Sequence, residues 1–130
     1  MRFEIDNIEY QTYLTIVSGN TAIGAIKGIW KSAETPVIGG KYHVELAIYL
    51  PEELDIHQNK KFCPSVCYSD QTVVFKGICG DVDDEVYFVR FDIDWLEMIS
   101  IQEFSTKKKA GDLVAFSADY YGIEIYPYTL

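Results

Sequence analysis

Apolar and polar residues alternate with a period of two along most of the chain. The clearest runs are residues 1–5, 42–50, 73–79, 87–95, 113–118 and 123–128. These runs are rich in Val, Ile, Tyr and Phe, which pack well on a pleated surface that is buried on one side. The pattern therefore predicts β-strands, each with one face in a core and the other in solvent.

Short segments of turn-forming residues separate these runs. They lie at residues 18–20, 36–40, 69–70, 80–84, 107–112 and 121–122. Gly, Asn, Asp and Ser in such positions favour turns. About seven strands at this spacing predict an all-β fold, a compact antiparallel β-barrel or sandwich, with a small OB-like or SH3-like barrel as one form.

Two segments have features of short helices. Residues 51–62 begin with Pro and two acids, which suits the start of a helix. Asp94 and Glu97 have the spacing of a capping box, but the apolar phase changes around them, so we expect a bend or a single helical turn between two strands. The length of 130 residues fits one domain. We therefore expect a single all-β domain over residues 1–130 with at most one or two short helices.

The chain is acidic, with 11 Lys and Arg against 20 Asp and Glu and a net charge of −9. Such a surface repels nucleic-acid phosphates and attracts a basic protein. Solubility alone would also account for the acidity. No apolar run approaches the length of a membrane span, and no charged start leads into an apolar segment. We therefore expect no membrane association and a cytoplasmic location.

The densest group of acids lies in residues 80–94. Its first part contains Asp81, Asp83, Asp84 and Glu85. With Asp92 these residues approach the spacing of a calcium-binding loop, but Val86 stands where that loop requires Gly, and Asp92 is shorter than the bidentate Glu. Both flanks alternate like strands, so a hairpin turn explains the acids without an ion.

Other constellations that could carry chemistry are incomplete. Asp92 and Asp94 share a strand face with Arg90, and we expect a solvated charged ridge there rather than a catalytic pair. The chain contains no Gly-x-Ser-x-Gly elbow and no glycine-rich phosphate loop. These observations predict a non-enzymatic protein without a cofactor.

The three cysteines raise the question of a zinc site. Cys63, Cys67 and Cys79 together with His57 would make a sound ligand set. Only Cys63 and Cys67 have the spacing of a ligand pair, and Cys79 lies on an apolar strand face. We therefore expect reduced cysteines and no metal.

The ten tyrosines exceed the needs of a core of this size. Tyr120, Tyr121, Tyr126 and Tyr128 cannot all point inward on alternating strands, so some are expected at the surface. Exposed tyrosines beside acids suit a protein interface. They also suit stacking on bases or sugars, although ordinary strand tyrosines with hydrated hydroxyls remain an alternative.

These features favour an acidic protein-binding domain, in its most concrete form an intracellular bacterial immunity or inhibitor protein that neutralises a basic toxin. The alternative is a small β-barrel that binds a carbohydrate or single-stranded nucleic acid through exposed tyrosines. The predicted binding residues are Asp119, Tyr120, Tyr121, Asp83, Asp84 and Glu85.

Overall fold

The computed structural model describes residues 1–56, 63–105 and 107–128. Over these ranges the chain is all-β, with no helix of seven or more residues. The strands are β1 (Arg2–Tyr10), β2 (Thr15–Thr21), β3 (Gly24–Trp30), β4 (Lys41–Ile48), β5 (Glu52–Glu53), β6 (Ser65–Ser69), β7 (Thr72–Val82), β8 (Val86–Asp92), β9 (Trp95–Ser100), β10 (Leu113–Asp119) and β11 (Ile123–Tyr128). Two 3-10 turns are η1 (Ile101–Glu103) and η2 (Tyr120–Gly122). The predicted all-β class and barrel are confirmed.

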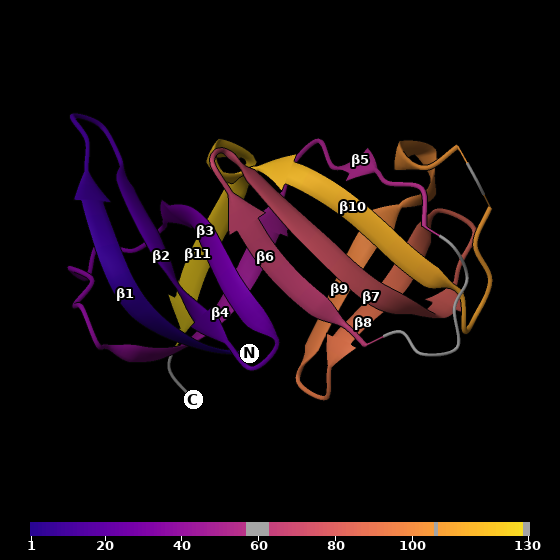
Figure 1. Cartoon of the computed structure of the whole chain (residues 1–130), viewed down its shortest axis with the longest axis horizontal. Helices are drawn as coiled ribbons and strands as arrows, with labels where there is room; N and C mark the ends of the chain where they lie inside the picture. Colours follow the sequence, from indigo (N-terminus) through magenta and orange to yellow (C-terminus); the bar gives the residue numbers. More distant parts are fainter. Residues whose placement is uncertain (57–62, 106, 129–130) are drawn as a thin grey trace.

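Five strands close into a barrel, which occupies the left half of Figure 1. β1 pairs antiparallel with β2 and with β4, and β2 pairs antiparallel with β3. β11, the last strand of the chain, closes the barrel because it pairs parallel with β3 and antiparallel with β4. The barrel is therefore assembled from the two ends of the sequence, with all the remaining strands inserted between β4 and β11.

The inserted strands form a second, twisted layer beside the barrel (Figure 1). The long strand β7 organises this layer, since it pairs with β6 and β10 and, further along, with β8. β9 follows β8 in a hairpin, and β5 pairs with β10. A parallel bridge between Gly24 and Val66 joins β3 to β6, so the two halves share one sheet.

The inward faces of both halves form one hydrophobic core. In the barrel, Phe3, Val44 and Ile125 are almost completely buried. In the inserted layer the Phe75 ring stacks on Phe116 at 5.0 Å between ring centroids, and further aromatic rings pack around this pair. Each fully buried large apolar side chain contributes about 1.5–3 kcal/mol to folding, which gives this layer its own stabilising centre.

The sequence pattern did not predict strands in which buried and exposed residues do not alternate. β2 buries four successive residues, Ile16 to Gly19, so it has no period of two to detect. Ile93, expected on the core face beside Trp95, is 90% exposed because the β8–β9 turn falls at residues 93–94. Residues 51–56, the described part of the first segment with helical features, form no helix. Glu52 and Glu53 pair with β10 instead, while residues 57–62 lie outside the described part of the chain.

Within the described ranges, no helix is long and apolar enough to cross a membrane.

Candidate functional site

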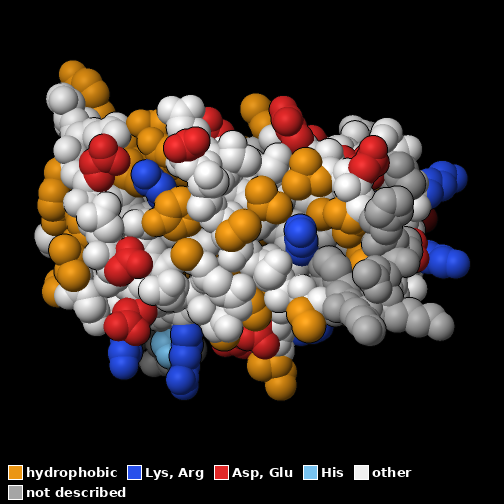
Figure 2. Space-filling view, viewed as in Figure 1, with side chains coloured by type: hydrophobic (Ala, Val, Ile, Leu, Met, Phe, Trp, Pro, Cys, Tyr) orange, Lys and Arg blue, Asp and Glu red, His pale blue; other side chains and the backbone are white. Residues whose placement is uncertain are grey.

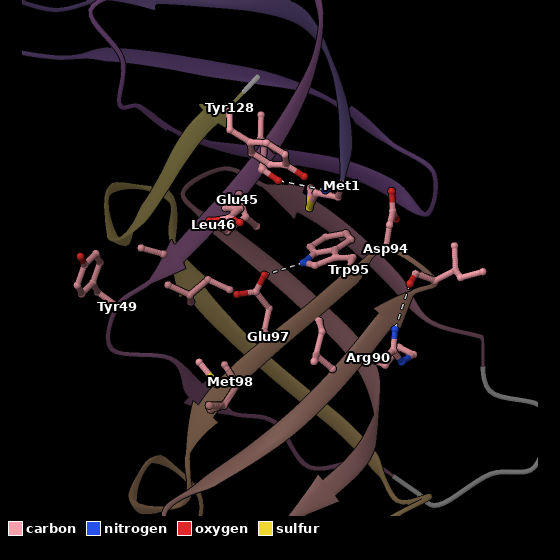
Figure 3. Close-up of a pocket in the computed structure, with 16 residues that line it drawn as sticks. Met1, Glu45, Leu46, Tyr49, Arg90, Asp94, Trp95, Glu97, Met98 and Tyr128 are labelled. Carbon is pink, nitrogen blue, oxygen red and sulfur yellow. Dashed lines mark hydrogen bonds between the residues drawn. The ribbon is translucent and has the colours of Figure 1, made fainter. Parts of the chain in front are cut away.

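A cleft of about 610 Å³ lies between the barrel and the β8–β9 hairpin (Figure 3). β4 and Tyr49 form one wall, β9 forms the other, and Tyr128 of β11 borders it. β9 pairs only with β8 among the described strands, so its second edge has no strand partner. The volume falls within the range of about 300–1,000 Å³ that is usual for small-molecule sites.

The walls of the cleft combine apolar side chains with four charged ones. Leu46 and Ile48 come from β4, and Leu96 and Met98 come from β9. Leu96 is 44% exposed and Met98 is 67% exposed, which is unusual for large apolar side chains on neighbouring positions of one strand. Water therefore covers an apolar surface that a ligand could bury.

Glu97 is the polar group inside this cleft. The indole nitrogen of Trp95 donates a hydrogen bond of 2.7 Å to Oε2 of Glu97 (Figure 3). Oε1 of Glu97 makes no hydrogen bond with any residue that the structure describes. Burial raises the pKa of Glu97 to about 7, with a further contribution from the Glu45 carboxylate, while the Trp95 bond and the Met1 amino group act in the opposite direction.

The other charged groups of the cleft are held at its borders. Arg90 donates from Nη1 to the carbonyl oxygens of Asp92 and Ile93, at 3.3 and 3.2 Å. The Met1 amino group donates to the carbonyl oxygen of Val44 at 3.1 Å. Glu45 and Asp94 are exposed carboxylates that line the cleft. Both cationic groups are therefore bound to main-chain oxygens, while the carboxylates face open space.

This arrangement has two chemical capacities. A carboxyl group with a pKa near 7 is present in both protonation states at neutral pH, so it can take up or release a proton there. When ionised, it offers a cation one free oxygen at a partly buried position, where electrostatic attraction is stronger than in bulk water.

Sequence reasoning missed Glu97, although a signal was present. Trp95, Glu97 and Ile99 share the inward face of β9, while Leu96 and Met98 point outward. An acid between two buried apolar residues, with apolar residues on the exposed face, is an inversion of the usual pattern. Asp94, considered as a catalytic acid with Asp92, does line the cleft, but the carboxyl with the raised pKa is Glu97.

The predicted tyrosines lie elsewhere, at η2 between β10 and β11. Tyr121 is 42% exposed, and Oδ1 of Asp119 accepts a hydrogen bond of 2.9 Å from its main-chain nitrogen. Tyr120 is 7% exposed, so it belongs to the core rather than projecting from the barrel. Lys27 lies over the Tyr120 ring, 4.3 Å from its centroid. Of the two neighbouring tyrosines, only Tyr121 offers its ring to a partner.

The β1–β2 hairpin adds tyrosines that the sequence did not single out. Tyr10 is 64% exposed and Tyr13, at the tip, is 96% exposed. The side chain of Gln11 donates to the hydroxyl oxygen of Tyr121 at 3.1 Å, which joins the hairpin to η2. We call this region the tyrosine–acid surface; its residues are Glu9, Tyr10, Tyr13, Asp119 and Tyr121.

The tyrosine–acid surface is a projection rather than a hollow. The β1–β2 hairpin extends beyond the end of the barrel in Figure 1, and Figure 2 shows hydrophobic side chains at that corner with acidic ones near it. Its residues line none of the four clefts that the structure shows most clearly.

Asp83, Asp84 and Glu85 lie at the far end of β7. Tyr120 donates to the carbonyl oxygen of Gln71, immediately before β7 begins, whereas the three acids follow its end. A strand of eleven residues spans roughly 33 Å, so the predicted binding residues do not form one surface. Asp83 stabilises its own hairpin turn, since its Oδ1 accepts from the Glu85 main-chain nitrogen at 3.1 Å.

Cys63, Cys67 and Cys79 do not form a metal site with other residues that the structure describes. Within residues 1–56, 63–105 and 107–128, no three His, Cys, Asp or Glu side chains are placed to hold a metal ion. Cys63 and Cys67 are free and exposed, and Cys79 is free and buried. His57 lies outside the described residues.

Comparison with known proteins gives no relative. No family model matches the chain, and neither the curated proteins nor the solved structures contain a significant match. The function must therefore be argued from the surfaces of the molecule itself.

Proposed function

We propose that this chain is an acidic protein-binding domain that docks a basic partner protein through the tyrosine–acid surface. In its most concrete form it is a cytoplasmic inhibitor, such as an immunity protein, and its partner is a basic toxin. The observation that carries the proposal is the nearly complete exposure of Tyr13 on a projecting hairpin, which Gln11 joins to Tyr121, with Glu9 and Asp119 close to Tyr121. The three free thiols suit a reducing compartment.

Exposed tyrosines are effective interface anchors. A tyrosine ring buries a large area on binding, while few rotatable bonds lose freedom. Three tyrosines of this surface, Tyr10, Tyr13 and Tyr121, expose between 42% and 96% of their surface. A projecting hairpin can place such rings in a hollow of the partner, and anchors of this kind contribute about 2 kcal/mol or more each when they are central.

Charge selects a basic partner. The chain carries a net charge of −9, and Glu9 and Asp119 add local negative charge around the tyrosines. Such a field accelerates encounter with a positively charged protein and slows encounter with nucleic acids and other acidic partners.

The test is capture of a partner from the source cell with tagged protein, followed by binding kinetics with the purified partner. We expect a protein of basic isoelectric point to bind the wild type. Tyr13→Ala combined with Tyr121→Ala should weaken the complex by at least about 30-fold through faster dissociation. Tyr126→Ala is the matched control, because Tyr126 is 38% exposed and lies outside the tyrosine–acid surface.

Salt dependence provides the second readout. The Debye length shortens from about 30 Å at 0.01 M to about 8 Å at 0.15 M salt, so association should slow while dissociation changes little. Glu9→Gln should slow association modestly. Capture of an acidic protein, or a complex that the tyrosine substitutions leave intact, would refute the proposal.

A second candidate function follows from the closed barrel. Five-stranded barrels of the OB type bind oligonucleotides or oligosaccharides on the second and third strands and the adjoining loops. Here that region includes the β1–β2 loop and Lys27 over Tyr120. Affinity for a single-stranded oligonucleotide or an oligosaccharide, lost on Tyr13→Ala and unaffected by Glu9→Gln, would favour this function over docking of a basic protein.

A further inference from the structure

We propose that the cleft between β4 and β9 binds a primary ammonium group carried on a short aliphatic stem. This site is separate from the tyrosine–acid surface, and the proposal does not depend on the docking function. It assigns a ligand chemistry to Glu97, which takes no part in the proposed protein docking.

The acceptor for the ammonium group is Oε1 of Glu97. The Trp95 indole occupies Oε2 at 2.7 Å and fixes the orientation of the carboxylate. Oε1 stays open to the cleft and has no hydrogen-bond partner among the described residues. Glu45, on the opposite wall, repels the ionised form of Glu97. A cation between the two carboxylates would relieve that repulsion.

One free oxygen favours ammonium over guanidinium. A guanidinium group binds a carboxylate best through two parallel hydrogen bonds, which need both oxygens. In Glu97 the Trp95 indole already bonds to Oε2, so a guanidinium group would have to share that oxygen with the indole. An ammonium group is a compact charge that can be satisfied by single acceptors, so the geometry of Glu97 selects it.

The walls of the cleft suit an aliphatic stem. Leu46 and Ile48 of β4 and Leu96 and Met98 of β9 all line it, with Leu96 and Met98 on the face of β9 opposite to Glu97. Covering the exposed side chains of Leu96 and Met98 would remove apolar surface from water. The Tyr128 ring borders the same space and can add a cation–π contact.

Binding should depend on pH through Glu97. The charged groups around it are Glu45 from β4, the Met1 amino group, Arg90 of β8 and Asp94 of the β8–β9 turn; Tyr49 and Tyr128 contribute hydroxyls. Arg90 and Met1 already bond to main-chain oxygens. Because burial raises the pKa of Glu97 to about 7, its ionised fraction increases about tenfold between pH 6 and pH 8. Alkylamines stay protonated over this range.

The probe is n-pentylamine, followed by the indole N–H signals of the protein in two-dimensional NMR. The chain has two tryptophans, and each provides one such signal. Trp95 reports on the cleft, and Trp30, whose indole donates to the Glu34 carbonyl oxygen at 2.8 Å, is an internal control. We expect saturable shifts of the Trp95 signal alone, with an association constant about tenfold higher at pH 8 than at pH 6.

Two controls test the role of the charge. 1-Pentanol has the same stem without the cation and should bind far more weakly. Glu97→Gln keeps an acceptor for the Trp95 indole but removes the negative charge, so pentylamine affinity should fall about 10- to 100-fold and lose its pH dependence. Glu103→Gln, at an exposed glutamate outside the cleft, should change neither the pentylamine affinity nor its pH dependence. Equal binding of the amine and the alcohol, or an unchanged affinity in Glu97→Gln, would overturn the proposal.

The ammonium group can belong to a small metabolite or to a lysine side chain of a protein. N-acetyl-lysine methylamide, which carries the same group on a peptide-like backbone, distinguishes the two sources. Tighter binding of the lysine derivative would assign the site to a protein ligand, and tighter binding of pentylamine would assign it to a small amine. Tighter binding of pentylguanidine than of either would contradict the preference for ammonium.

Discussion

Replacing Glu97 by Gln should stabilise the folded protein, by an amount that increases with pH. Burial in the cleft raises the pKa of Glu97 from 4.5 to about 7. The folded protein therefore keeps a proton that the unfolded chain releases between these two pH values. The stability that this proton confers is complete below about pH 4.5 and is lost as the pH rises through about 7.

The size of the effect follows from the pKa difference. One pKa unit corresponds to about 1.4 kcal/mol, so the free-energy cost of ionising Glu97 in the fold reaches about 3 kcal/mol above neutral pH. At pH 5.5 the wild type has already lost about 1.4 kcal/mol of unfolding free energy through this pKa difference. The free energy of unfolding of Glu97→Gln, relative to that of the wild type, should therefore increase by about 2 kcal/mol between pH 5.5 and pH 8. The amide oxygen of the substituted side chain can still accept the Trp95 hydrogen bond.

Urea denaturation followed by tryptophan fluorescence measures the free energy of unfolding at each pH. Thermal unfolding provides a second measure, because each kcal/mol of unfolding free energy shifts the melting temperature of a domain of this size by about 4 °C. Glu103→Gln is the control, because it removes the same charge from an exposed position. A stability difference between Glu97→Gln and the wild type that stays constant over this pH range would refute the reasoning. So would the same pH-dependent difference in Glu103→Gln.

Three further predictions concern the core and the thiols. Gly19→Ala would press its Cβ against the main-chain oxygen of Glu4 and should cost about 1–3 kcal/mol of unfolding free energy, whereas Gly80→Ala has room and should change stability by less than about 1 kcal/mol in the same denaturation assay. Phe75→Ala removes a fully buried ring from the aromatic cluster and should cost about 3–5 kcal/mol, measured by denaturation. A thiol reagent should label the two exposed cysteines rapidly and Cys79 only on unfolding, because burial shields the Cys79 thiol and raises its pKa; rapid labelling of all three would contradict the packing of β7.

The period of two determined the fold class without any tertiary information. An alternating strand such as β7 shows in its own sequence which side chains face the core, and the turn residues at its end mark where it stops. The same local pattern predicted a hairpin turn at residues 80–84, and the structure has the turn at residues 83–85. The pattern could not predict strand β2, because both faces of that strand are buried and its sequence shows no alternation.

The candidate sites depended on contacts that the sequence does not encode locally. Tyr120 and Tyr121 are adjacent and identical in chemistry, yet one is 7% and the other 42% exposed, since the direction of η2 and its packing against β3 decide which ring is covered. The raised pKa of Glu97 likewise requires β4 and β9, about 50 residues apart, to face each other across a cleft. Burial and electrostatic coupling between distant strands exist only after the barrel closes, so the chemistry of Glu97 belongs to the tertiary structure.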